Sequence, residues 1–345
     1  MSRTRRRFSM FFLFILLVAG AVAWWGWQRY IAFADSPMAG IEDGSGLVVE
    51  RGDSLPVVVR KLRETGVREG SSIEWRVLSR EMDADGRLQV GEYALEPGTT
   101  PRELLVAMRD GKVVRYSFTV LPGRNFRELR AALSRAEPLR QEVPSLDDAA
   151  LMKALGHAGQ HPEGRFLPET YHYTRGDSDL DVLERAHQAM RKALAEAWET
   201  RAEDTQLKSP DEMLTLASIV EKETGQAAER PLVAAVFVNR LRQGMPLQSD
   251  PTVIYALPTF DGSLTRADLA WPSPYNTYVT PGLPPGPIAN PGLAAIEAVL
   301  APADVPYLYF VSRNDGSHVF SSTLAEHNRA VARYQRGGGG ANILD

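Results

Sequence analysis

The start of the chain divides into a short basic segment and a long apolar run. No charged side chain occurs between Phe8 and Gln28, and roughly 20 apolar residues in a helix span the ~30 Å hydrocarbon core of a bilayer. Arginines before such a run mark the cytoplasmic side, and tryptophans favour the membrane interface at its far end. These residues are Arg3, Arg5, Arg6 and Arg7, then Trp24, Trp25 and Trp27. We therefore expect a cytoplasmic segment at 1–7, a transmembrane anchor at 8–28, and the remaining chain on the outer side.

A cleaved signal peptide is the alternative to a retained anchor. The run Ala32-Phe33-Ala34 resembles a small-residue cleavage site. However, secretory apolar cores extend over only about 7 to 15 residues, and this run is longer and rich in tryptophan. The pattern favours the anchor, followed by a linker at 29–44.

After the linker, a strand, a glycine, a polar cap and a helix recur in the same order. The expected strand and helix pairs are 47–49 with 55–64, 93–95 with 101–108, and 116–121 with 126–134. Thr100-Pro101-Arg102-Glu103 is a capping box with proline at the first helical position. Residues 45–112 resemble a LysM-like module, a small αβ unit associated with glycan binding; a plain α+β spacer remains the alternative.

Further along, the apolar pattern predicts helices and then a hairpin. Residues 180–202 are amphipathic with helical spacing. The strand-like runs 307–311 and 319–320 enclose the turn Asn314-Asp315-Gly316, which is a hairpin signal. The glycine-rich segment 336–345 is expected to be a flexible tail. The fold class predicted from these elements is α+β.

One helix carries a carboxylate in a position suited to acid–base chemistry. Ser209-Pro210-Asp211-Glu212 opens the helix as a capping box, and Gly225 ends it. Glu221 lies in the last turn, above a mostly apolar face, where partial desolvation and the helix dipole both favour the protonated form. A general acid needs that form. A structural glutamate paired with an arginine is the alternative, and Glu223 is expected to be solvated or supporting.

The amino-acid composition argues against several classes of function. The net charge is −4 and the pI about 6.0, without the basic excess of a nucleic-acid-binding protein. The chain has no cysteine, which excludes disulfides, cysteine-based zinc sites and thiol nucleophiles. The six histidines lack metal-binding spacing, and no glycine-rich phosphate loop occurs. We therefore expect no metal, no cofactor and no nucleic-acid partner.

Several long motifs resemble the MltG (YceG-like) family of endolytic murein transglycosylases. In chain order they are 163–171 (EGRFLPETY), 217–224 (ASIVEKET), 236–241 (VFVNRL), 245–255 (MPLQSDPTVIY), 275–278 (YNTY) and 282–288 (GLPPGPI). Glu169 stands where the family often has aspartate, which keeps the charge. The resemblance covers the anchor, the LysM-like module and nearly all of 115–335, and it implies a catalytic domain at 113–335.

The resemblance implies an activity and a location. Members of the family cut the MurNAc-GlcNAc bond within nascent glycan strands, leave 1,6-anhydroMurNAc ends and so terminate strand elongation. The implied catalytic residue is Glu221, acting as a lyase acid and then base, so that no second carboxylate is needed. The implied location is the inner membrane, crossed once, with the catalytic domain in the periplasm. The implied partners are peptidoglycan glycan strands and peptidoglycan synthases.

A set of polar and aromatic side chains is expected around the substrate. Amides and phenols hydrogen-bond sugar hydroxyls, and aromatic faces stack on pyranose rings. The candidate substrate-binding residues are Gln248, Asp250, Tyr275, Asn276, Tyr278, Asn239 and Arg240. Core packing of the tyrosines, a turn-capping Asp250 and a structural ion pair of Arg240 are the alternatives.

Two other functions remain open from the sequence. One is a lysozyme-type hydrolase that uses Glu221 with Asp250, since ordinary glycosidases need two carboxyl groups. The other is a non-enzymatic scaffold that binds the cell wall through the LysM-like module.

Overall fold

A computed structural model describes residues 3–42, 44–203 and 205–335. The chain divides into two compact units. The first comprises the described residues up to Tyr116 together with Thr174–Gly176, and the second comprises the others. The expected tail at 336–345 and the first two residues of the expected cytoplasmic segment lie outside the described residues.

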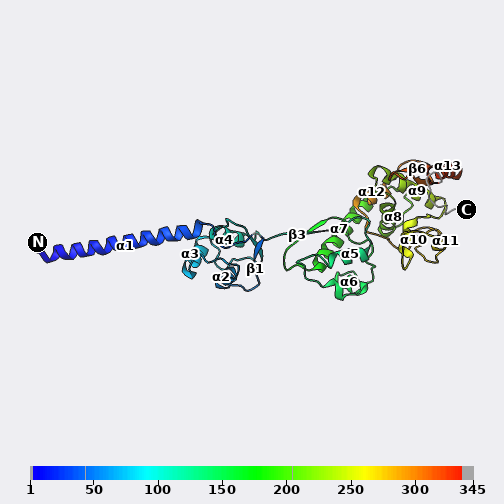
Figure 1. Ribbon diagram of the computed structural model, residues 1–345. Helices are drawn as coiled ribbons and strands as arrows, with labels where there is room; N and C mark the ends of the chain where they lie inside the picture. Colours follow the sequence, from blue (N-terminus) through cyan, green and yellow to red (C-terminus); the bar gives the residue numbers. More distant parts are fainter. Residues whose placement is uncertain (1–2, 43, 204, 336–345) are drawn as a thin grey trace. The chain divides into compact units, whose positions relative to one another are not determined.

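The first helix, α1 (Arg3–Asp35), includes the apolar run (Figure 1). Its segment Met10–Asp35 is long and apolar enough to cross a membrane, with a mean hydropathy of 2.0. The expected linker at 29–44 is partly wrong, because α1 continues to Asp35 before the chain leaves the helix. The apolar side chains near this end explain the difference: Phe33 is buried in the core of the first unit and meets Trp75 edge to face at 5.2 Å.

The rest of the first unit is a small mixed α and β structure. Its elements are β1 (Ser45–Val49), α2 (Leu55–Glu64), α3 (Ser72–Glu81), β2 (Gly91–Leu95) and α4 (Pro101–Asp110). Strands β1 and β2 pair antiparallel, with Leu47 opposite Tyr93. The helix α3 has no counterpart in the repeating pattern. It forms because Ser71 and Glu74 make a capping box and Trp75 and Leu78 are buried beneath it.

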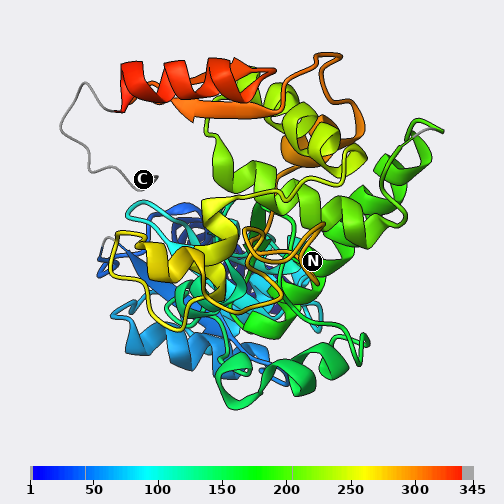
Figure 2. The ribbon, with the colours of Figure 1, turned by 90° about the vertical axis from the view of Figure 1, so that its right-hand side faces the viewer.

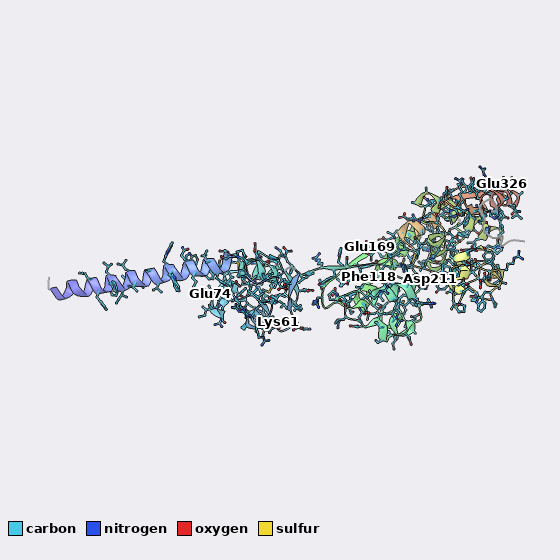
Figure 3. All side chains as sticks on the ribbon, viewed as in Figure 1. Lys61, Glu74, Phe118, Glu169, Asp211 and Glu326 are labelled. Carbon is cyan, nitrogen blue, oxygen red and sulfur yellow. The ribbon has the colours of Figure 1, made fainter. Side chains whose placement is uncertain are left out.

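Ion pairs form near the N-terminus of α2. Lys61, labelled in Figure 3, contacts Asp53 and Glu50 at 2.7 Å each. These contacts connect the β1–α2 loop to the following helix. The glycan-binding role expected of the LysM-like module stays a prediction.

The second unit is mostly helical, with two short strand pairs. Its elements are β3 (Tyr116–Thr119), α5 (Phe126–Leu133), η1 (Val143–Ser145), α6 (Asp148–Ala154), β4 (Thr170–Tyr173), α7 (Asp179–Glu199), α8 (Pro210–Glu223), η2 (Ala227–Glu229), α9 (Arg230–Arg242), α10 (Asp250–Ala256), α11 (Arg266–Leu269), α12 (Leu293–Leu300), β5 (Tyr309–Ser312), β6 (His318–Ser321) and α13 (Leu324–Tyr334). Strand β3, whose first residue Tyr116 belongs to the first unit, pairs with β4. The expected hairpin is confirmed as β5–β6, with Val311 opposite Val319. In Figure 2 the red helix α13 lies along this orange hairpin.

Helix α8 is the centre of the second unit. Every residue from Met213 to Val220 is buried, and α7, α9 and α12 pack around it. A helix that is apolar on all sides is stable only inside a core. The expected capping box at its start is half formed: the Ser209 side chain accepts the Glu212 N–H, whereas the Glu212 carboxylate accepts the N–H of Lys208. The last turn of α8 lies at the edge of the core. Its carboxylates, Glu221 and Glu223, contact Gly292 and Ser249 in neighbouring loops.

Candidate active site at the end of helix α8

Glu221 caps a neighbouring helix. Its Oε2 accepts the backbone N–H of Gly292 at 3.0 Å, and Gly292 is the N-cap residue of α12. A carboxylate at a helix N-terminus satisfies an otherwise unpaired donor and complements the helix dipole. The carboxyl is half-buried, and the nearest chain on its other side is the loop at Gly123. No arginine contacts Glu221 in the described part of the chain, so the expected structural alternative takes the form of a helix cap rather than an ion pair.

Glu223 has the more unusual environment. Its carboxylate accepts a hydrogen bond from Ser249 Oγ at 2.5 Å. Burial, helped by the negative charge of Asp250, raises the pKa of Glu223 to about 7, although the Ser249 hydrogen bond and the charge of Arg240 act in the opposite direction. Of the two roles expected for Glu223, solvated or supporting, these contacts do not fit a fully solvated side chain. Its partners lie about 26 residues further along the chain, which is why helical spacing alone did not reveal them.

Most of the expected substrate-binding residues gather near Glu223. Asp250 begins α10 and accepts a hydrogen bond from the Tyr278 hydroxyl at 2.6 Å. Burial and the neighbouring Asp250 raise the pKa of Tyr278, which therefore stays a hydrogen-bond donor. Gln248 is exposed and has a φ of 49°, and its backbone N–H bonds to Thr277 O at 3.1 Å. This turn connects the segment of Gln248 and Asp250 to that of Tyr278.

Arg240 holds this turn through hydrogen bonds to Leu247 and Gln248. Its side chain is 7% exposed, and its guanidinium donates to Leu247 O at 2.8 Å and Leu308 O at 2.7 Å. It also donates to Gln248 Oε1 at 3.4 Å. The hydrogen bonds of Arg240 go to the backbone of two loops and to Gln248 rather than to Glu221. Its positive charge acts on Glu223 instead.

Two of the expected substrate ligands have structural roles. Asn276 is 0% exposed; its amide donates to Leu269 O and Trp271 O, and its oxygen accepts the Tyr278 N–H. Asn239 donates to Val305 O at 2.8 Å and Tyr307 O at 3.0 Å. The amide of the buried Asn276 is fully used within the fold and is not available to sugar hydroxyls, which corrects the expectation for Asn276. The amide nitrogen of Asn239 is used in the same way.

Tyr275 packs against the core of the second unit and is not a fully exposed side chain. It is half-buried against the core and meets Tyr255 at 5.0 Å between ring centroids. Burial raises its pKa. The core-packing alternative therefore describes Tyr275 in this structure.

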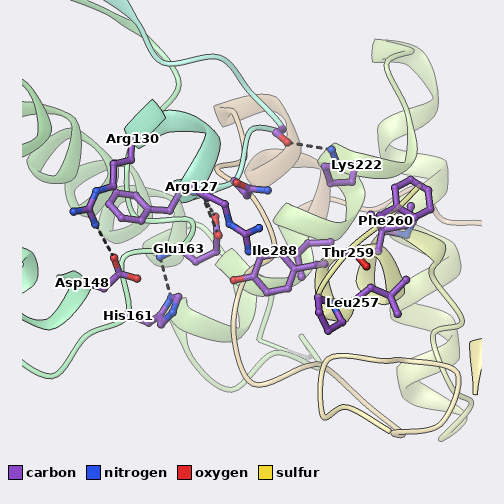
Figure 4. Close-up of a pocket in the computed structure, with 17 residues that line it drawn as sticks. Arg127, Arg130, Asp148, His161, Glu163, Lys222, Leu257, Thr259, Phe260 and Ile288 are labelled. Atoms are coloured by element: carbon purple, nitrogen blue, oxygen red, sulfur yellow. Dashed lines mark hydrogen bonds and ion pairs between the residues drawn. The ribbon is translucent and has the colours of Figure 1, made fainter. Parts of the chain in front are cut away.

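A cavity of about 500 Å³ is lined in part by Pro251, Ile254 and Tyr255 of α10 (Figure 4). Lys222 and Pro251 line it, and these residues are the sequence neighbours of Glu223 and Asp250. Figure 4 shows Arg127 and Glu163 on its opposite wall. Two residues of the cavity lining thus directly adjoin members of the Glu223 cluster in the sequence.

Glu163 is a second carboxyl that the sequence reasoning missed. It is 4% exposed, and its two oxygens accept the Phe126 N–H at 2.9 and 3.1 Å. Burial raises the pKa of Glu163 to about 7, against the lowering effect of these hydrogen bonds. The only sequence signal was its place in the motif 163–171.

Asn290 joins the three segments that border the cavity entrance. It is fully buried; its Oδ1 accepts the Phe166 N–H at 3.0 Å, and its backbone exchanges hydrogen bonds with the Gly123–Arg124 loop. The side-chain amide also donates to Arg124 O at 3.1 Å. The loops around Glu221 and Glu163 are therefore fixed to one another.

Comparison with known proteins gives three consistent similarities. The model of the YceG-like family matches residues 47–333. An endolytic murein transglycosylase of Bacillus subtilis (strain 168) is 33% identical over 263 residues, which are 71% of this chain and 73% of the relative. The one from Streptococcus pneumoniae serotype 2 (strain D39 / NCTC 7466) is 33% identical over 203 residues, which are 56% of this chain and 36% of that longer protein.

A solved structure agrees with these sequence similarities. The crystal structure of a yceG-like protein from Listeria monocytogenes has a TM-score of 0.55 and 30% sequence identity, and it covers 83% of this chain and 98% of that one.

Proposed function

Because this chain belongs to the YceG-like family, we propose that it is a membrane-anchored lytic transglycosylase acting on peptidoglycan. Its substrate is the glycan strand, cut between N-acetylmuramic acid and N-acetylglucosamine within nascent chains. The products are strands with 1,6-anhydroMurNAc ends, and the cut ends strand elongation. The relatives named endolytic murein transglycosylases support the reaction class.

The surroundings of Glu223 are the observation that carries this proposal: its carboxylate accepts a hydrogen bond from Ser249, which lies in the chain between the exposed residues Gln248 and Asp250. A general acid works best when its pKa lies near the operating pH, and the pKa of Glu223 is raised to about 7. In the proposed reaction this carboxyl gives its proton to the glycosidic oxygen as the bond to C1 breaks. The muramyl C6 hydroxyl then attacks C1 and returns its proton to the same carboxylate. An internal nucleophile held near its target needs no second catalytic carboxylate.

The neighbours of Glu223 have supporting roles in this proposal. The negative charge of Asp250 helps to keep the proton on Glu223. Sugar hydroxyls can hydrogen-bond to three polar side chains here. Gln248 and Asp250 are exposed, and Tyr278 is half-buried and bonded to Asp250. Arg240 positions their turn through the backbone of residues 246–247.

Glu221 remains the second candidate for the catalytic carboxyl. The motif that resembles the family contains both glutamates, and the cavity entrance at Gly123 lies beside Glu221. Its hydrogen bond to Gly292 gives it a capping role that Glu223 lacks. We favour Glu223 because the exposed polar residues gather around it.

A pair of matched variants separates the two carboxyls. Full-length wild type, Glu223→Gln and Glu221→Gln, purified in detergent, are given uncrosslinked glycan strands, and the products are weighed by mass spectrometry. We expect Glu223→Gln to lose a factor of about 10²–10⁴ in rate, the usual contribution of a general acid. Glu221→Gln keeps most activity and loses about 1 kcal/mol of stability with its helix cap.

The opposite pattern would assign the chemistry to Glu221. Reducing ends in place of anhydro ends would identify a lysozyme-type hydrolase. Equal inactivity of all three proteins, with strands still bound, would identify a scaffold.

We also propose that residues 45–112 hold the glycan strand near the membrane. A cavity of about 450 Å³ in the first unit supports this role, since it lies between the β1–α2 loop and the α3–β2 loop. Ser54, Pro56, Arg76 and Asp85 are among its lining residues. Full-length Glu223→Gln should then sediment with insoluble peptidoglycan, and adding Arg76→Glu should reduce the bound fraction; an unchanged fraction would remove the role.

The proposed location is the inner membrane, crossed once by α1, with the second unit in the periplasm. Helix α1 supports this proposal by its length and composition. Association with peptidoglycan synthases stays a prediction, which cross-linking of the full-length protein in growing cells would test.

A further inference from the structure

The cavity beside α10 carries positive charge in a protein whose net charge is −4. Arg127 and Lys222 both line it and both are exposed. Neither has a carboxylate within ion-pair distance in the part of the chain that the structure describes, and Lys222 donates only to the carbonyl of Gly123, at 3.2 Å. A third cation, Arg130, contacts Asp148 at 3.3 Å and is neutralised there.

Glu163, the buried carboxyl of the cavity wall, offsets the positive charge of Arg127 and Lys222 only partly. Glu163 has a pKa raised to about 7 by burial, so a large fraction of it is uncharged at neutral pH. Its oxygens also face the N–H of Phe126 rather than either cation. The cavity therefore keeps a net positive charge from Arg127 and Lys222.

The remaining lining is mixed. Asn125, His161 and Thr259 are polar, and the apolar members are Phe126, Pro251, Ile254, Tyr255, Leu257, Pro258, Phe260 and Ile288. A site of about 500 Å³ that combines apolar side chains with convergent polar groups has the size of a pocket for a small molecule or a short peptide. A flat, neutral sugar unit would leave the two cations without partners.

We propose that this cavity is a subsite for the carboxylate-bearing peptide attached to the muramyl residue of the substrate. The inference rests on the proposed function, because it assumes that a glycan strand lies across Glu223 and Asp250. The peptide of murein branches from the lactyl group of the muramyl unit and carries free carboxylates and apolar side chains. Arg127 offers a planar donor fork to a carboxylate, and Lys222 offers a second charge (Figure 4).

The position of the cavity fits a branch from a strand at Glu223. Lys222 and Pro251 form its near edge, and each directly adjoins a member of the Glu223–Asp250 cluster in sequence. Arg127 lies on the far wall, on α5. The peptide would therefore enter between α8 and α10 and point towards Arg127.

A binding experiment without turnover tests the subsite directly. Full-length Glu223→Gln in detergent is titrated with N-acetylmuramyl-L-alanyl-D-glutamate and with its neutral diamide. We expect the diacid to bind about tenfold more tightly than the diamide, as for one charge-assisted contact. Adding Arg127→Gln should remove this preference, and Lys222→Gln should reduce it.

The matched control is Arg135→Gln, which removes an exposed arginine just beyond α5 that does not line the cavity. It should keep the tenfold preference. Equal binding of diacid and diamide by the parent, or a preference that survives Arg127→Gln, would overturn the subsite.

Turnover separates this inference from the proposed function. In the active protein, Arg127→Gln should raise KM about tenfold for peptide-bearing strands and leave kcat unchanged, and KM for peptide-free strands should not change. Normal cleavage with equal KM effects on both substrates would overturn the subsite alone. A wild type that binds the diacid selectively but cuts neither strand would overturn the proposed function and leave the subsite standing.

Discussion

At the scale of single residues, the second unit contains two carboxyls that hold their protons unusually well. Burial raises the pKa of both Glu163 and Glu223 to about 7. Glu223 is half-buried and accepts a hydrogen bond from the Ser249 hydroxyl, whereas Glu163 is enclosed and accepts a backbone N–H group. The same physical cause favours the proton-donor role that we propose for Glu223, and at Glu163 it makes folding less favourable as the pH rises.

The pH dependence of stability should reveal Glu163. Its ordinary pKa is 4.5, so between pH 4.5 and about 7 the unfolded chain ionises while the folded protein keeps the proton. This raised pKa makes the folded state progressively less stable over that window, and the loss is complete above it. Full-length Glu163→Gln cannot titrate, so its melting temperature should improve relative to wild type from pH 5 to pH 8.

The control is Glu169→Gln, which removes an exposed carboxyl from the same segment. Its difference from wild type should stay nearly constant over this range. A constant difference for Glu163→Gln as well would show that Glu163 is charged throughout.

At the scale of elements, loops rather than helices bring the site together. Gly164 has a φ of 75°, and a Cβ there would lie 2.5 Å from Pro287 Cγ. The proline-rich segment 282–288 can approach the motif 163–171 only because this position has no side chain. The close approach also places Ile288 at the cavity wall, near Glu163.

Gly164→Ala should therefore destabilise the protein through two effects. An alanine with positive φ costs about 1 kcal/mol, and the overlap with Pro287 adds about 1–3 kcal/mol. Gly159 has a φ of 87° with no atom near its would-be Cβ, so Gly159→Ala carries only the first cost. Denaturant unfolding of the two full-length variants measures the difference, and equal losses would contradict the contact with Pro287.

At the scale of the whole molecule, the end of α1 argues for a retained anchor. Cleavage after Ala34 would remove Tyr30, Phe33 and Ala34 itself, all of which are buried in the core of the first unit. Burying a large apolar side chain contributes about 1.5–3 kcal/mol, so the small first unit would lose much of its stability. The end of α1 and the elements that follow it therefore share one core.

Cysteine labelling tests both retention and orientation, because the chain has no native cysteine. A membrane-impermeant maleimide should label Ser263→Cys, an exposed position in the second unit, in cells with a permeabilised outer membrane. Ser2→Cys, in the segment expected to be cytoplasmic, should be labelled only after lysis and on a full-length chain. Loss of the Ser2→Cys label from the mature protein would identify a cleaved signal peptide.

The sequence by itself determined the features that depend on neighbours along the chain. The apolar run of α1, the capping box of α4 and the β5–β6 hairpin arise from interactions over a few residues, and their patterns were predictive. Helix α2 begins and ends at the residues that the pattern predicted, Leu55 and Glu64. The family resemblance likewise rested on contiguous motifs.

Only the tertiary structure decided which polar side chains are available for chemistry. The pKa of Glu223 depends on Ser249, Asp250 and Arg240, and the burial of Asn276 depends on carbonyls that fold back over it. Desolvation and charge act through space, between segments that lie far apart in the chain. The helical spacing of α8 therefore located two glutamates, and the fold distinguished Glu221, which caps a helix, from Glu223, which is hydrogen-bonded to Ser249.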